Sequence, residues 1–465
     1  MSASADYDLV VLGAGPGGYV AAIRATQLGL RTAVVERDRP GGVCGNWGCI
    51  PSKAILSDAA LFAEAKAAGR RGIVADGLRV DYARVVERSR EVADRQAKGV
   101  ASLFKKNGVA YHPGSGRLVA GGVAVMADGA GPVELGARNV LVATGSRERL
   151  LPGLEVDGKV VVTSREALET RQLPSSVAIV GGGAVGVEFA YIYASFGARV
   201  TVVEMAETLL PGMDADLGRE LERLFKRQGI EVLTRHRYER FERTADGARL
   251  TLAGPDASRA VEAAQVLVAV GRAPLTDGIG LEERGIRLDK GFVVVDGQMR
   301  TGAGDVWAIG DVVGPLLLAH TASEQGVVAV ETMAGKHPVA ADPTRVPICI
   351  YCTPEVAAVG LSEADARARG HDVRVGRFPF RALGRAMASG HVDGFVKLVS
   401  DARYGEILGV HMIGAGVTEL IAEATLGRAL EATTEDLIAT VHAHPTMAEA
   451  LREAALVAEG RGVNV

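Results

Sequence analysis

Two cysteines five positions apart, Cys44 and Cys49, are the residues of this 465-residue chain whose types and spacing point most directly to chemistry. They lie in the glycine-rich segment Gly41-Gly42-Val43-Cys44-Gly45-Asn46-Trp47-Gly48-Cys49. A disulfide needs Cα atoms about 4.4–6.8 Å apart, whereas five residues of regular helix rise about 7.5 Å. The two cysteines can therefore join only if the chain turns irregularly between them, and Gly45 and Gly48 supply the freedom for such a turn.

Cys49 is followed by features that favour a reactive thiolate. An apolar, helix-compatible run extends from Ile50 to Leu56, with Pro51 at a position that a first helical turn tolerates. Cys49 is therefore expected at a helix N-terminus, where the helix dipole and the nearby Lys53 favour the thiolate. Two reduced structural cysteines are the alternative. The glycine-rich turn, and the position just after a nucleotide-binding pattern, favour redox chemistry instead.

The elements that must position this pair are two copies of a strand, glycine turn, helix and strand. The turns are Gly13-Ala14-Gly15-Pro16-Gly17-Gly18 and Gly181-Gly182-Gly183-Ala184-Val185-Gly186. In each copy an acid lies eighteen residues after the last glycine, Glu36 in the first and Glu204 in the second. Such glycines let the backbone approach a pyrophosphate at a helix N-terminus, and the acid accepts ribose hydroxyls. The contacts predicted from this pattern are Gly13, Gly15, Gly18, Gly181, Gly183 and Gly186.

A related strand closes each copy. The first runs from Asn139 into Ala143-Thr144-Gly145, and the second runs from Gln265 to Gly271. A further strand, Val306 to Ile309, meets Gly310-Asp311 and is expected to return to the first unit. No Arg or Lys follows Glu204 directly, so the second nucleotide is predicted to be NAD(H) rather than NADP(H). With the thiol pair contiguous to the first unit, FAD is assigned there.

The fold class is therefore predicted as α/β, with two Rossmann-like domains and a C-terminal α+β domain. Strand-like and helical segments alternate after about Arg345. The predicted domains are an FAD-binding part (1–148), an NAD-binding domain (149–274), a return to the FAD-binding domain (275–343) and a C-terminal domain (344–465). The length agrees with several domains rather than one core.

Composition excludes several function classes. The formal net charge is -4, from 52 Lys and Arg against 56 Asp and Glu, and no basic stripe suggests nucleic acid or a membrane surface. Four cysteines do not form a secreted disulfide framework, and neither a signal peptide nor a membrane span is indicated. A cytoplasmic location is expected. Cys349 and Cys352 are expected to be free, largely buried thiols on a strand, and no metal site is predicted.

These motifs together resemble the class I flavin-linked pyridine nucleotide-disulfide oxidoreductases, over nearly the whole chain. Within that family they are most similar to the dihydrolipoyl dehydrogenase branch. Besides the cysteine segment and both glycine turns, the matching motifs are Ala143-Thr144-Gly145-Ser146, Ala308-Ile309-Gly310-Asp311 and His442-Ala443-His444-Pro445-Thr446. The resemblance implies oxidation of protein-bound dihydrolipoamide with reduction of NAD+, through a Cys44–Cys49 disulfide and FAD. The implied setting is a 2-oxo acid dehydrogenase or glycine-cleavage complex, with a lipoylated protein as partner.

The resemblance also implies roles for individual residues. Glu36 is expected at the adenosine ribose of FAD, and Lys53 near the flavin N5, paired with Glu188. The remaining expected cofactor contacts are Gly116, Ala143, Thr144, Gly145, Asp311, Leu317, Leu318, Ala319 and His320 for FAD, and Glu204 and Gly271 for NAD.

A base is needed because a substrate dithiol is mostly protonated at neutral pH. The resemblance makes His444 that base and Glu449 its orienting partner, supplied by the other subunit of a homodimer. Thr446-Met447-Ala448-Glu449 also matches a helix capping box, which would explain the acid without catalysis. His442 is the second candidate for the base.

Other functions stay open at this point. A glutathione-type reductase shares the fold and cysteine spacing but generally uses NADPH. Mercuric reductase needs a C-terminal cysteine pair, which these last residues do not contain. A flavin-bound scaffold subunit would not need Cys44, Cys49, Lys53 and His444.

Overall fold

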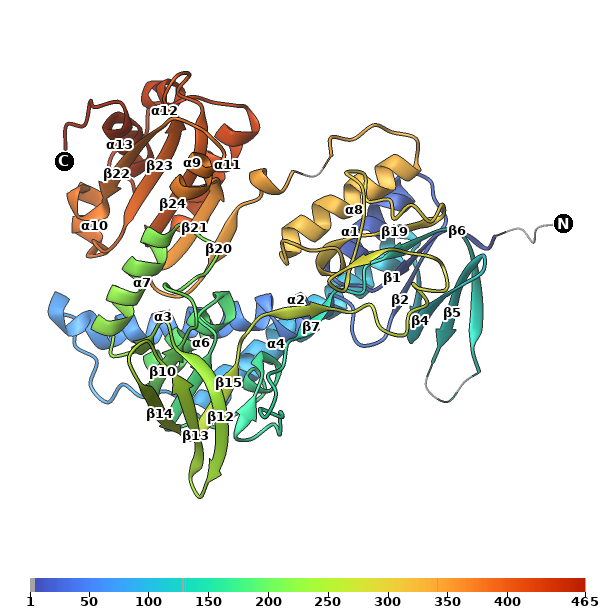
Figure 1. Ribbon diagram of the computed structural model, residues 1–465, viewed down its shortest axis with the longest axis horizontal. Helices are drawn as coiled ribbons and strands as arrows, with labels where there is room; N and C mark the ends of the chain where they lie inside the picture. The colour runs from blue at the N-terminus through green and yellow to red at the C-terminus, as the bar shows by residue number, and fades with distance from the viewer. Residues whose placement is uncertain (1–4, 128, 130, 341, 465) are drawn as a thin grey trace. The chain divides into compact units, whose positions relative to one another are not determined.

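The computed structural model describes residues 5–127, 129, 131–340 and 342–464, so the first four residues of the polar N-terminal segment lie outside the described part. The chain forms two compact units (Figure 1). Unit 1 comprises Met1–Ala54, Ala83–Arg149 and Gly271–Pro343. Unit 2 comprises Ile55–Tyr82, Leu150–Val270 and Thr344–Val465. The domain boundaries predicted after residues 148, 274 and 343 stay predictions.

Unit 1 is built on a mixed sheet in the order β3-β2-β1-β6-β5-β4. β19 also pairs with β6, along the edge opposite β1. Its strands are β1 (Tyr7–Leu12), β2 (Thr32–Glu36), β3 (Ala110–Pro113), β4 (Ser115–Val119), β5 (Gly122–Met126), β6 (Val133–Val142) and β19 (Val306–Ala308). The pairs of β1 with β2 and β6, of β2 with β3 and of β6 with β19 are parallel. β19 therefore returns to the first unit, as predicted. Short pairs complete it: β7 (Ser146–Glu148) with β16 (Arg272–Pro274), and β17 (Leu288–Asp289) with β18 (Phe292–Val293).

Helices cover one face of this sheet because its central strands are apolar on both sides, as parallel strands usually are. Residues of α1 (Pro16–Gln27), α4 (Tyr82–Asn107) and α8 (Ala319–Met333) share one buried cluster with β1. α1 and α8 approach closely, since a Cβ on Gly17 would lie 2.9 Å from the Ala322 carbonyl oxygen. α4 was not predicted from the sequence. α2 (Gly42–Trp47), the first part of α3 (Cys49–Ala67) and the 3-10 turn η2 (Gly310–Val312) complete this unit.

The nucleotide-binding part of unit 2 repeats this plan. Its sheet has the order β11-β10-β9-β15-β8 and is parallel throughout. The strands are β8 (Val161–Val162), β9 (Ser176–Val180), β10 (Arg199–Val203), β11 (Glu231–Leu233) and β15 (Gln265–Val268). The helices here are α5 (Ser164–Ala167), α6 (Ala184–Phe196) and α7 (Ala215–Arg227), and 3-10 turn η1 (Ala68–Arg71) follows α3. The predicted internal duplication is visible in the four strands that correspond, β3-β2-β1-β6 in unit 1 and β11-β10-β9-β15 in unit 2.

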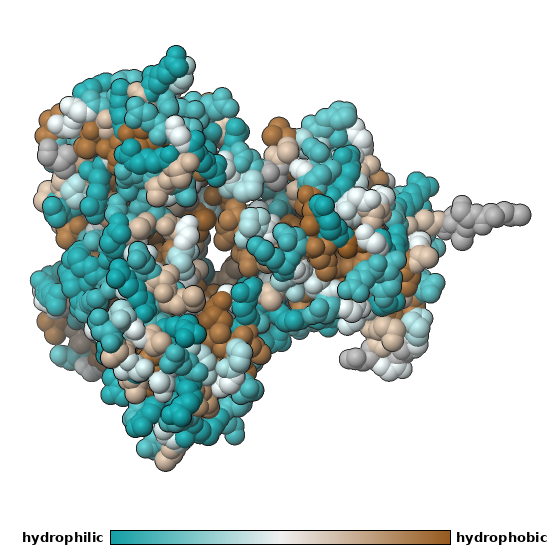
Figure 2. Space-filling model, in the orientation of Figure 1, coloured by the Kyte–Doolittle hydropathy of each residue, from teal (hydrophilic) through white to brown (hydrophobic). Residues whose placement is uncertain are grey.

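An antiparallel meander is appended to each copy. In unit 2 it consists of β12 (Arg237–Thr244), β13 (Gly247–Ala253) and β14 (Ser258–Ala263). β12 is mostly charged, with only Tyr238 and Phe241 packed against the buried cluster, and Figure 2 shows hydrophilic residues over much of this hairpin. The opposite side contributes Leu250 and Leu252 to the buried cluster shared with the parallel sheet.

The C-terminal part of unit 2 is an antiparallel sheet in the order β20-β21-β24-β23-β22. Its strands are β20 (Ile348–Ile350), β21 (Glu355–Gly360), β22 (Val373–Pro379), β23 (Phe395–Asp401) and β24 (Ile407–Gly414). α11 (Val417–Ala429), α12 (Thr434–Ala439) and α13 (Glu449–Ala458) share the main buried cluster with one face. α9 (Glu363–Ala368) packs on the other face. The short elements η3 (Pro343–Arg345), η4 (Phe380–Ala382) and α10 (Gly384–Ser389) connect these. The predicted α+β character is confirmed, although β21 and β22 were missed.

The turn geometry yields a prediction about Gly18. A Cβ at Gly18 would overlap the carbonyl oxygen of Gly13, which is rigid backbone. We expect Gly18→Ala to lower the free energy of unfolding by about 3 kcal/mol, because overpacking against backbone cannot relax. Urea unfolding measures this value. Gly99→Ala is the control, since nothing lies within 4 Å of a Cβ there and alanine is favoured in a helix by about 1 kcal/mol. An equally stable Gly18→Ala protein would contradict the expectation.

Candidate active site and nucleotide-binding loops

The cysteine segment of unit 1 lies on two consecutive helices. Cys44 is in α2, Gly48 leaves the helical path with φ -150° and ψ -111°, and α3 begins at Cys49. A Cβ on Gly48 would lie 3.2 Å from the Val43 carbonyl oxygen, a tight contact that favours glycine. The structure thus has the predicted break between the cysteines and the predicted helix start. The prediction that Gly45 also loosens the turn is wrong, because Gly45 is buried inside α2.

The start of α2 is held against the first glycine turn. Gly41, with φ 97°, donates its N–H to the carbonyl oxygen of Ala14 at 2.8 Å. Gly42, with φ 57°, approaches Gly15 so closely that a Cβ would lie 2.6 Å from its Cα. A side chain at Gly42 would push the segments apart. The glycines therefore place the thiols next to the nucleotide-binding turn.

The two thiols have unequal tendencies to ionise. Both cysteines are half-buried. Hydrogen bonding to the Cys49 side chain, reinforced by burial, raises the pKa of the Cys44 thiol well above its usual value, and Lys53 opposes this rise. Because Cys49 lies at the positive end of α3, the first negative charge of the pair belongs on Cys49. This asymmetry supports different roles for the two sulfurs.

Lys53 and Glu188 belong to different units, so their predicted pairing stays a prediction. Lys53 lies one turn after Cys49 on α3. Glu188 lies on α6, is buried, and accepts a hydrogen bond from the backbone N–H of Tyr351 at 3.0 Å. This bond ties the acid to the chain just after β20, a partner that the sequence did not reveal.

The first glycine turn has the geometry that a pyrophosphate requires. Gly13 has φ 107°, and a Cβ there would overlap the Ala143 carbonyl oxygen. Nothing lies within 4 Å of a Cβ on Gly15, which precedes α1, and no side chain caps that helix. The first N–H groups of α1 therefore point into open space, where an anion fits. These residues fit a dinucleotide.

Glu36 ends β2 and braces this turn. Its carboxylate accepts the N–H of Ala14 at 2.7 Å and that of Asp38 at 2.8 Å. Burial raises the pKa of Glu36, against the effect of these two bonds. The acid thus holds the turn while its remaining lone pairs can meet ribose hydroxyls.

The second glycine turn has the same backbone conformation, close contacts and acid hydrogen bonds as the first. Gly181 has φ 113°, a Cβ on Gly186 would overlap the Gly181 carbonyl oxygen, and nothing lies within 4 Å of a Cβ on Gly183. Glu204 follows β10 and accepts the N–H groups of Gly182 and Ala206, both at 2.7 Å. This turn also fits a dinucleotide.

Four further predicted contacts lie near strand ends or in the meander of unit 1. Gly145 and Gly271 have φ 75° and 100°, and nothing lies within 4 Å of a Cβ on either. Thr144 donates its hydroxyl to the Leu275 carbonyl oxygen at 2.7 Å. Gly116 lies on β4, where a Cβ would meet the Leu12 side chain at 2.5 Å.

Asp311 lies in η2, within a polar network of unit 1 that the sequence did not reveal. Ser146 donates to Asp311, and Arg272 donates to the Ser146 hydroxyl at 2.7 Å and to Glu148 at 2.9 Å. One oxygen of Asp311 is thereby fixed in position. Beyond it Leu317 and Leu318 lead into α8, which begins at Ala319 and His320 without a side-chain cap.

His444 and Glu449 form a hydrogen-bonded pair within unit 2. His444 Nδ1 lies 2.9 Å from Glu449 Oε2, and its side chain is 75% exposed. Glu449 Oε1 accepts the Thr446 N–H at 2.7 Å. One carboxylate therefore orients the histidine and satisfies the chain before α13. The predicted capping box is incomplete, because the Thr446 hydroxyl donates to the Ala443 carbonyl oxygen instead.

His442 is placed differently. Its side chain is only 5% exposed, its Nε2 lies 2.8 Å from Glu423 and its Nδ1 lies 3.1 Å from the Thr440 carbonyl oxygen. Both ring nitrogens are therefore engaged. His444 Nε2 has no such partner among the residues that the structure describes, so His444 is the better base.

The second cysteine pair has no redox geometry. Cys349 lies on β20, and its sulfur is 3.9 Å from the Thr418 carbonyl oxygen. Cys352 is fully buried, and its sulfur is 3.3 Å from the Pro354 carbonyl oxygen. The prediction of largely buried side chains is confirmed for Cys352, whereas Cys349 is half-buried. Within the described ranges, no group of three or more His, Cys, Asp or Glu residues could hold a metal ion.

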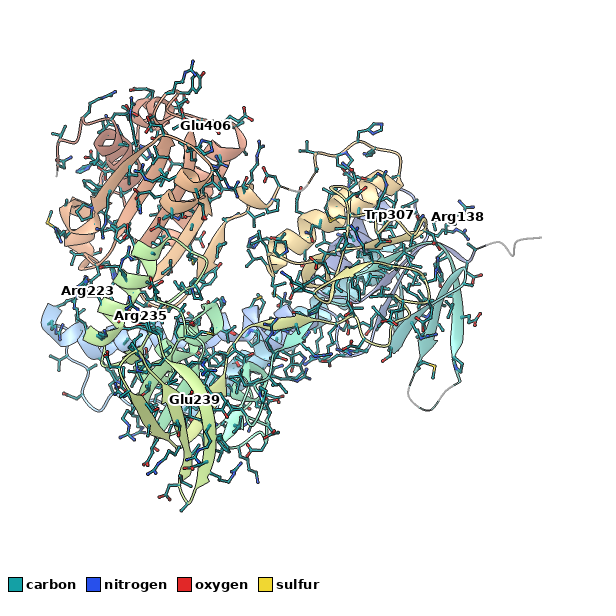
Figure 3. All side chains as sticks on the ribbon, viewed as in Figure 1. Arg138, Arg223, Arg235, Glu239, Trp307 and Glu406 are labelled. Atoms are coloured by element: carbon teal, nitrogen blue, oxygen red, sulfur yellow. The ribbon has the colours of Figure 1, made fainter. Side chains whose placement is uncertain are left out.

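Tertiary structure brings one cation near the second acid. Arg235, labelled in Figure 3, donates its backbone N–H to the Ala206 carbonyl oxygen at 2.9 Å. Its guanidinium lies 3.6 Å from Glu207. The sequence pattern missed this residue because it lies after β11, far along the chain from Glu204. Arg235 is thus ion-paired with Glu207, while the Glu204 carboxylate is bonded to the backbone of Gly182 and Ala206.

None of the helices in the described part of the chain is long and apolar enough to cross a membrane.

Comparisons with known proteins cover both halves of the chain. Residues 7–326 match the family model described as pyridine nucleotide-disulphide oxidoreductase, and residues 346–455 match its dimerisation domain. The chain is 44% identical to the dihydrolipoyl dehydrogenase of Bacillus subtilis over 470 residues, covering 99% of both chains. It is 46% identical to that of Chlorobaculum tepidum over 456 residues, covering 97% of both.

Solved structures agree in fold. LpdA from Mycobacterium tuberculosis matches with a TM-score of 0.89 and 30% identity, covering 96% of this chain and 98% of that one. The HOCl-induced flavoprotein disulfide reductase RclA from Escherichia coli matches with a TM-score of 0.85 and 26% identity, covering 97% of this chain and 100% of that one.

The His444–Glu449 pair predicts a pH-dependent stability. Burial opposes ionisation of Glu449, but hydrogen bonds from His444 and from the Thr446 N–H outweigh it and hold its pKa below the usual 4.5. A lowered folded pKa gives stability that is present above the unfolded pKa and lost as pH falls through the folded one. We expect Glu449→Gln to cost about 1 kcal/mol of unfolding free energy at pH 7.

That difference should shrink as the pH falls from 4.5 through the lower folded pKa, because the carboxylate is protonated first in the unfolded protein and then in the folded protein. Urea unfolding at a series of pH values measures it. Glu419→Gln, at an exposed residue of α11, is the control and should show no such trend. A Glu449→Gln deficit that is constant down to strong acid would contradict the ionised pair.

Proposed function

This chain belongs to the pyridine nucleotide-disulphide oxidoreductase family, and we propose that it acts as a dihydrolipoyl dehydrogenase. The proposed reaction oxidises protein-bound dihydrolipoamide to lipoamide and reduces NAD+. The observation that supports it most is the close contact of Gly42 with Gly15. This contact holds the segment that contains Cys44 and Cys49 against the first nucleotide-binding turn. A redox pair must lie beside its cofactor, and this contact achieves that. The predicted lipoylated partner, its complex and the cytoplasmic location stay predictions.

FAD, bound along the first glycine turn, supplies two-electron chemistry between the thiol pair and NAD+. In the oxidised enzyme, a substrate thiolate attacks Cys44, the Cys44–Cys49 bond breaks, and Cys49 leaves as a thiolate. The second substrate thiolate then attacks the sulfur of the substrate that is bound to Cys44. Lipoamide leaves, and both cysteines hold the two electrons. Cys49 is the sulfur suited to bear charge, because it opens α3 near Lys53.

His444 takes the proton of one substrate thiol at Nε2, and the proton of the second thiol passes to the Cys44 sulfur as that sulfur leaves the mixed disulfide. Glu449 fixes the ring through Nδ1, so that Nε2 is the free nitrogen, and stabilises the imidazolium that forms. The matched dimerisation domain indicates a homodimer. We place His444 opposite the Cys44–Cys49 pair of the partner subunit, which makes the dimer the catalytic unit.

The rival function is an NADPH-dependent reductase of another disulfide, such as a glutathione-type substrate. It requires cations at the ribose of the second nucleotide. Two carboxylates, Glu204 and Glu207, favour NAD+ there instead.

Cys44→Ser tests the thiol relay. We expect it to abolish dihydrolipoamide-dependent NAD+ reduction while FAD stays bound, because a serine oxygen cannot form the mixed disulfide. The assay follows NADH formation, and the flavin spectrum reports bound FAD. Cys349→Ser, at a half-buried thiol away from this segment, should keep normal turnover. Near-normal turnover in Cys44→Ser would remove Cys44 from the reaction.

The choice of nucleotide forms a separate prediction. Values of kcat/KM should favour NAD+ over NADP+ by about 100-fold, equivalent to roughly 2.7 kcal/mol, because Glu204 repels a 2′-phosphate. Glu207→Gln should raise the use of NADP+ by releasing Arg235, and leave NAD+ almost unaffected. Glu239→Gln, at another exposed ion-paired acid, is the control (Figure 3). Equal use of both nucleotides by the wild type would favour the rival function.

A further inference from the structure

A buried ion cluster joins the C-terminal sheet of unit 2 to helix α7. Lys397, on β23, is only 4% exposed. Its ammonium lies 3.0 Å from Asp214, 2.7 Å from Asp216 and 3.1 Å from Glu363. Asp214 and Asp216 belong to the start of α7, and Glu363 opens α9. A buried charge is retained only where partners satisfy it, and here three carboxylates surround one cation.

The cluster holds the residue that starts α7. Asp214 is the N-cap, and its Oδ1 accepts the N–H of Asp216 at 3.0 Å. Burial lowers the pKa of Lys397, but the surrounding carboxylates more than reverse this and raise it. Burial raises the pKa of Asp216, but Lys397 and Arg219 outweigh it and lower that pKa to about 2. Lys397, Asp216 and Glu363 are therefore charged at neutral pH, and the ion pair of Lys397 with Asp214 fixes the helix start to the sheet.

The loop before Asp214 runs back to the second glycine turn. Leu210 donates its N–H to the Gly182 carbonyl oxygen at 2.9 Å, and a Cβ on Gly182 would lie 2.7 Å from the Leu209 side chain. Both leucines are buried. Leu210 has φ 55°, a region that costs a leucine energy and persists only where neighbours enforce it. On the other side, a Cβ on Gly218 of α7 would overlap the Leu209 carbonyl oxygen.

These contacts form a continuous chain from Lys397 through Asp214 and the Leu209–Leu210 loop to Gly182. Gly182 in turn donates its N–H to Glu204, the acid at the ribose position. We propose that Lys397 is a positioning residue for the NAD+ site, which holds the second glycine turn and Glu204 in place from the C-terminal sheet. The inference rests on the proposed use of NAD+ at this turn. It makes the affinity for NAD+ depend on the part of the chain that matches the dimerisation domain.

Lys397→Met tests the proposal in the FAD-containing dimer. Methionine keeps the length of the side chain and removes its charge. We expect the dissociation constant of NADH and the KM for NAD+ to rise about tenfold, within the usual range of coupling between sites. Flavin reduction by dihydrolipoamide without NAD+ should stay within about twofold of the wild type, because Cys44 and Cys49 are not on this chain of contacts.

Lys226→Met is the matched control. Lys226 lies on the same helix, in an exposed ion pair with Glu222 at 2.7 Å, and its loss should change neither quantity. Asp214→Asn is the second variant if Lys397→Met does not fold. Asparagine caps a helix as well as aspartate does, so the helix start is kept while its charge link to Lys397 is lost. NADH binding should weaken there by about threefold, a smaller coupling because two carboxylates still hold Lys397.

Unchanged NADH affinity in a folded Lys397→Met dimer would overturn the proposal. An equal fall in NADH affinity and in flavin reduction by dihydrolipoamide would also overturn it, since that pattern marks general destabilisation. If the variant does not fold, unchanged affinity in Asp214→Asn has the same meaning. Absence of dithiol-dependent flavin reduction in the wild type would instead refute the proposed substrate, while NADH binding still tests Lys397.

Discussion

Close approach of one backbone to another, at places where a side chain would collide, is the constraint on which this structure depends. Gly18 lies against Gly13, Gly186 against Gly181 and Gly42 against Gly15. The first two contacts bring a helix start to the end of its strand and leave uncapped N–H groups facing open space. The third brings the redox cysteines to the same place. Cofactor binding and thiol chemistry therefore depend on the same tight backbone contacts.

Two acids hold these turns in place by hydrogen bonds to backbone N–H groups. Glu36 and Glu204 each accept two backbone N–H groups, one of them from their own glycine turn. A buried carboxylate is costly unless such bonds satisfy it, so each acid also fixes the turn beside it. The acid that we propose contacts the ribose thus also stabilises the loop that we propose binds the pyrophosphate. Glu449 likewise has two partners. Its carboxylate orients the His444 ring and accepts the Thr446 N–H before α13.

Buried charge extends this control beyond the nucleotide turns. The cluster around Lys397 connects the C-terminal sheet to the start of α7, and the Leu209–Leu210 loop connects α7 to Gly182. In unit 1, Arg272 and Ser146 hold Asp311 in a comparable way. Residues that contact a cofactor are thus held by residues far away in the sequence.

The sequence by itself determined the family and the two nucleotide units, and it predicted the reactive residues. Glycine spacing, a terminal acid and a close cysteine pair are local patterns, because each works through neighbours within about twenty residues of chain. It also predicted the break at Gly48 and the helix start at Cys49, although it assigned Gly45 a flexibility that α2 does not use.

Only the tertiary structure decided which residues support that chemistry. It engaged both ring nitrogens of His442 and left His444 Nε2 open, brought Arg235 to Glu207, and surrounded Lys397 with carboxylates from α7 and α9. None of these pairs has a characteristic spacing, because the partners meet through packing of separate elements. Burial and charge balance depend on distances in space, which a linear pattern does not contain.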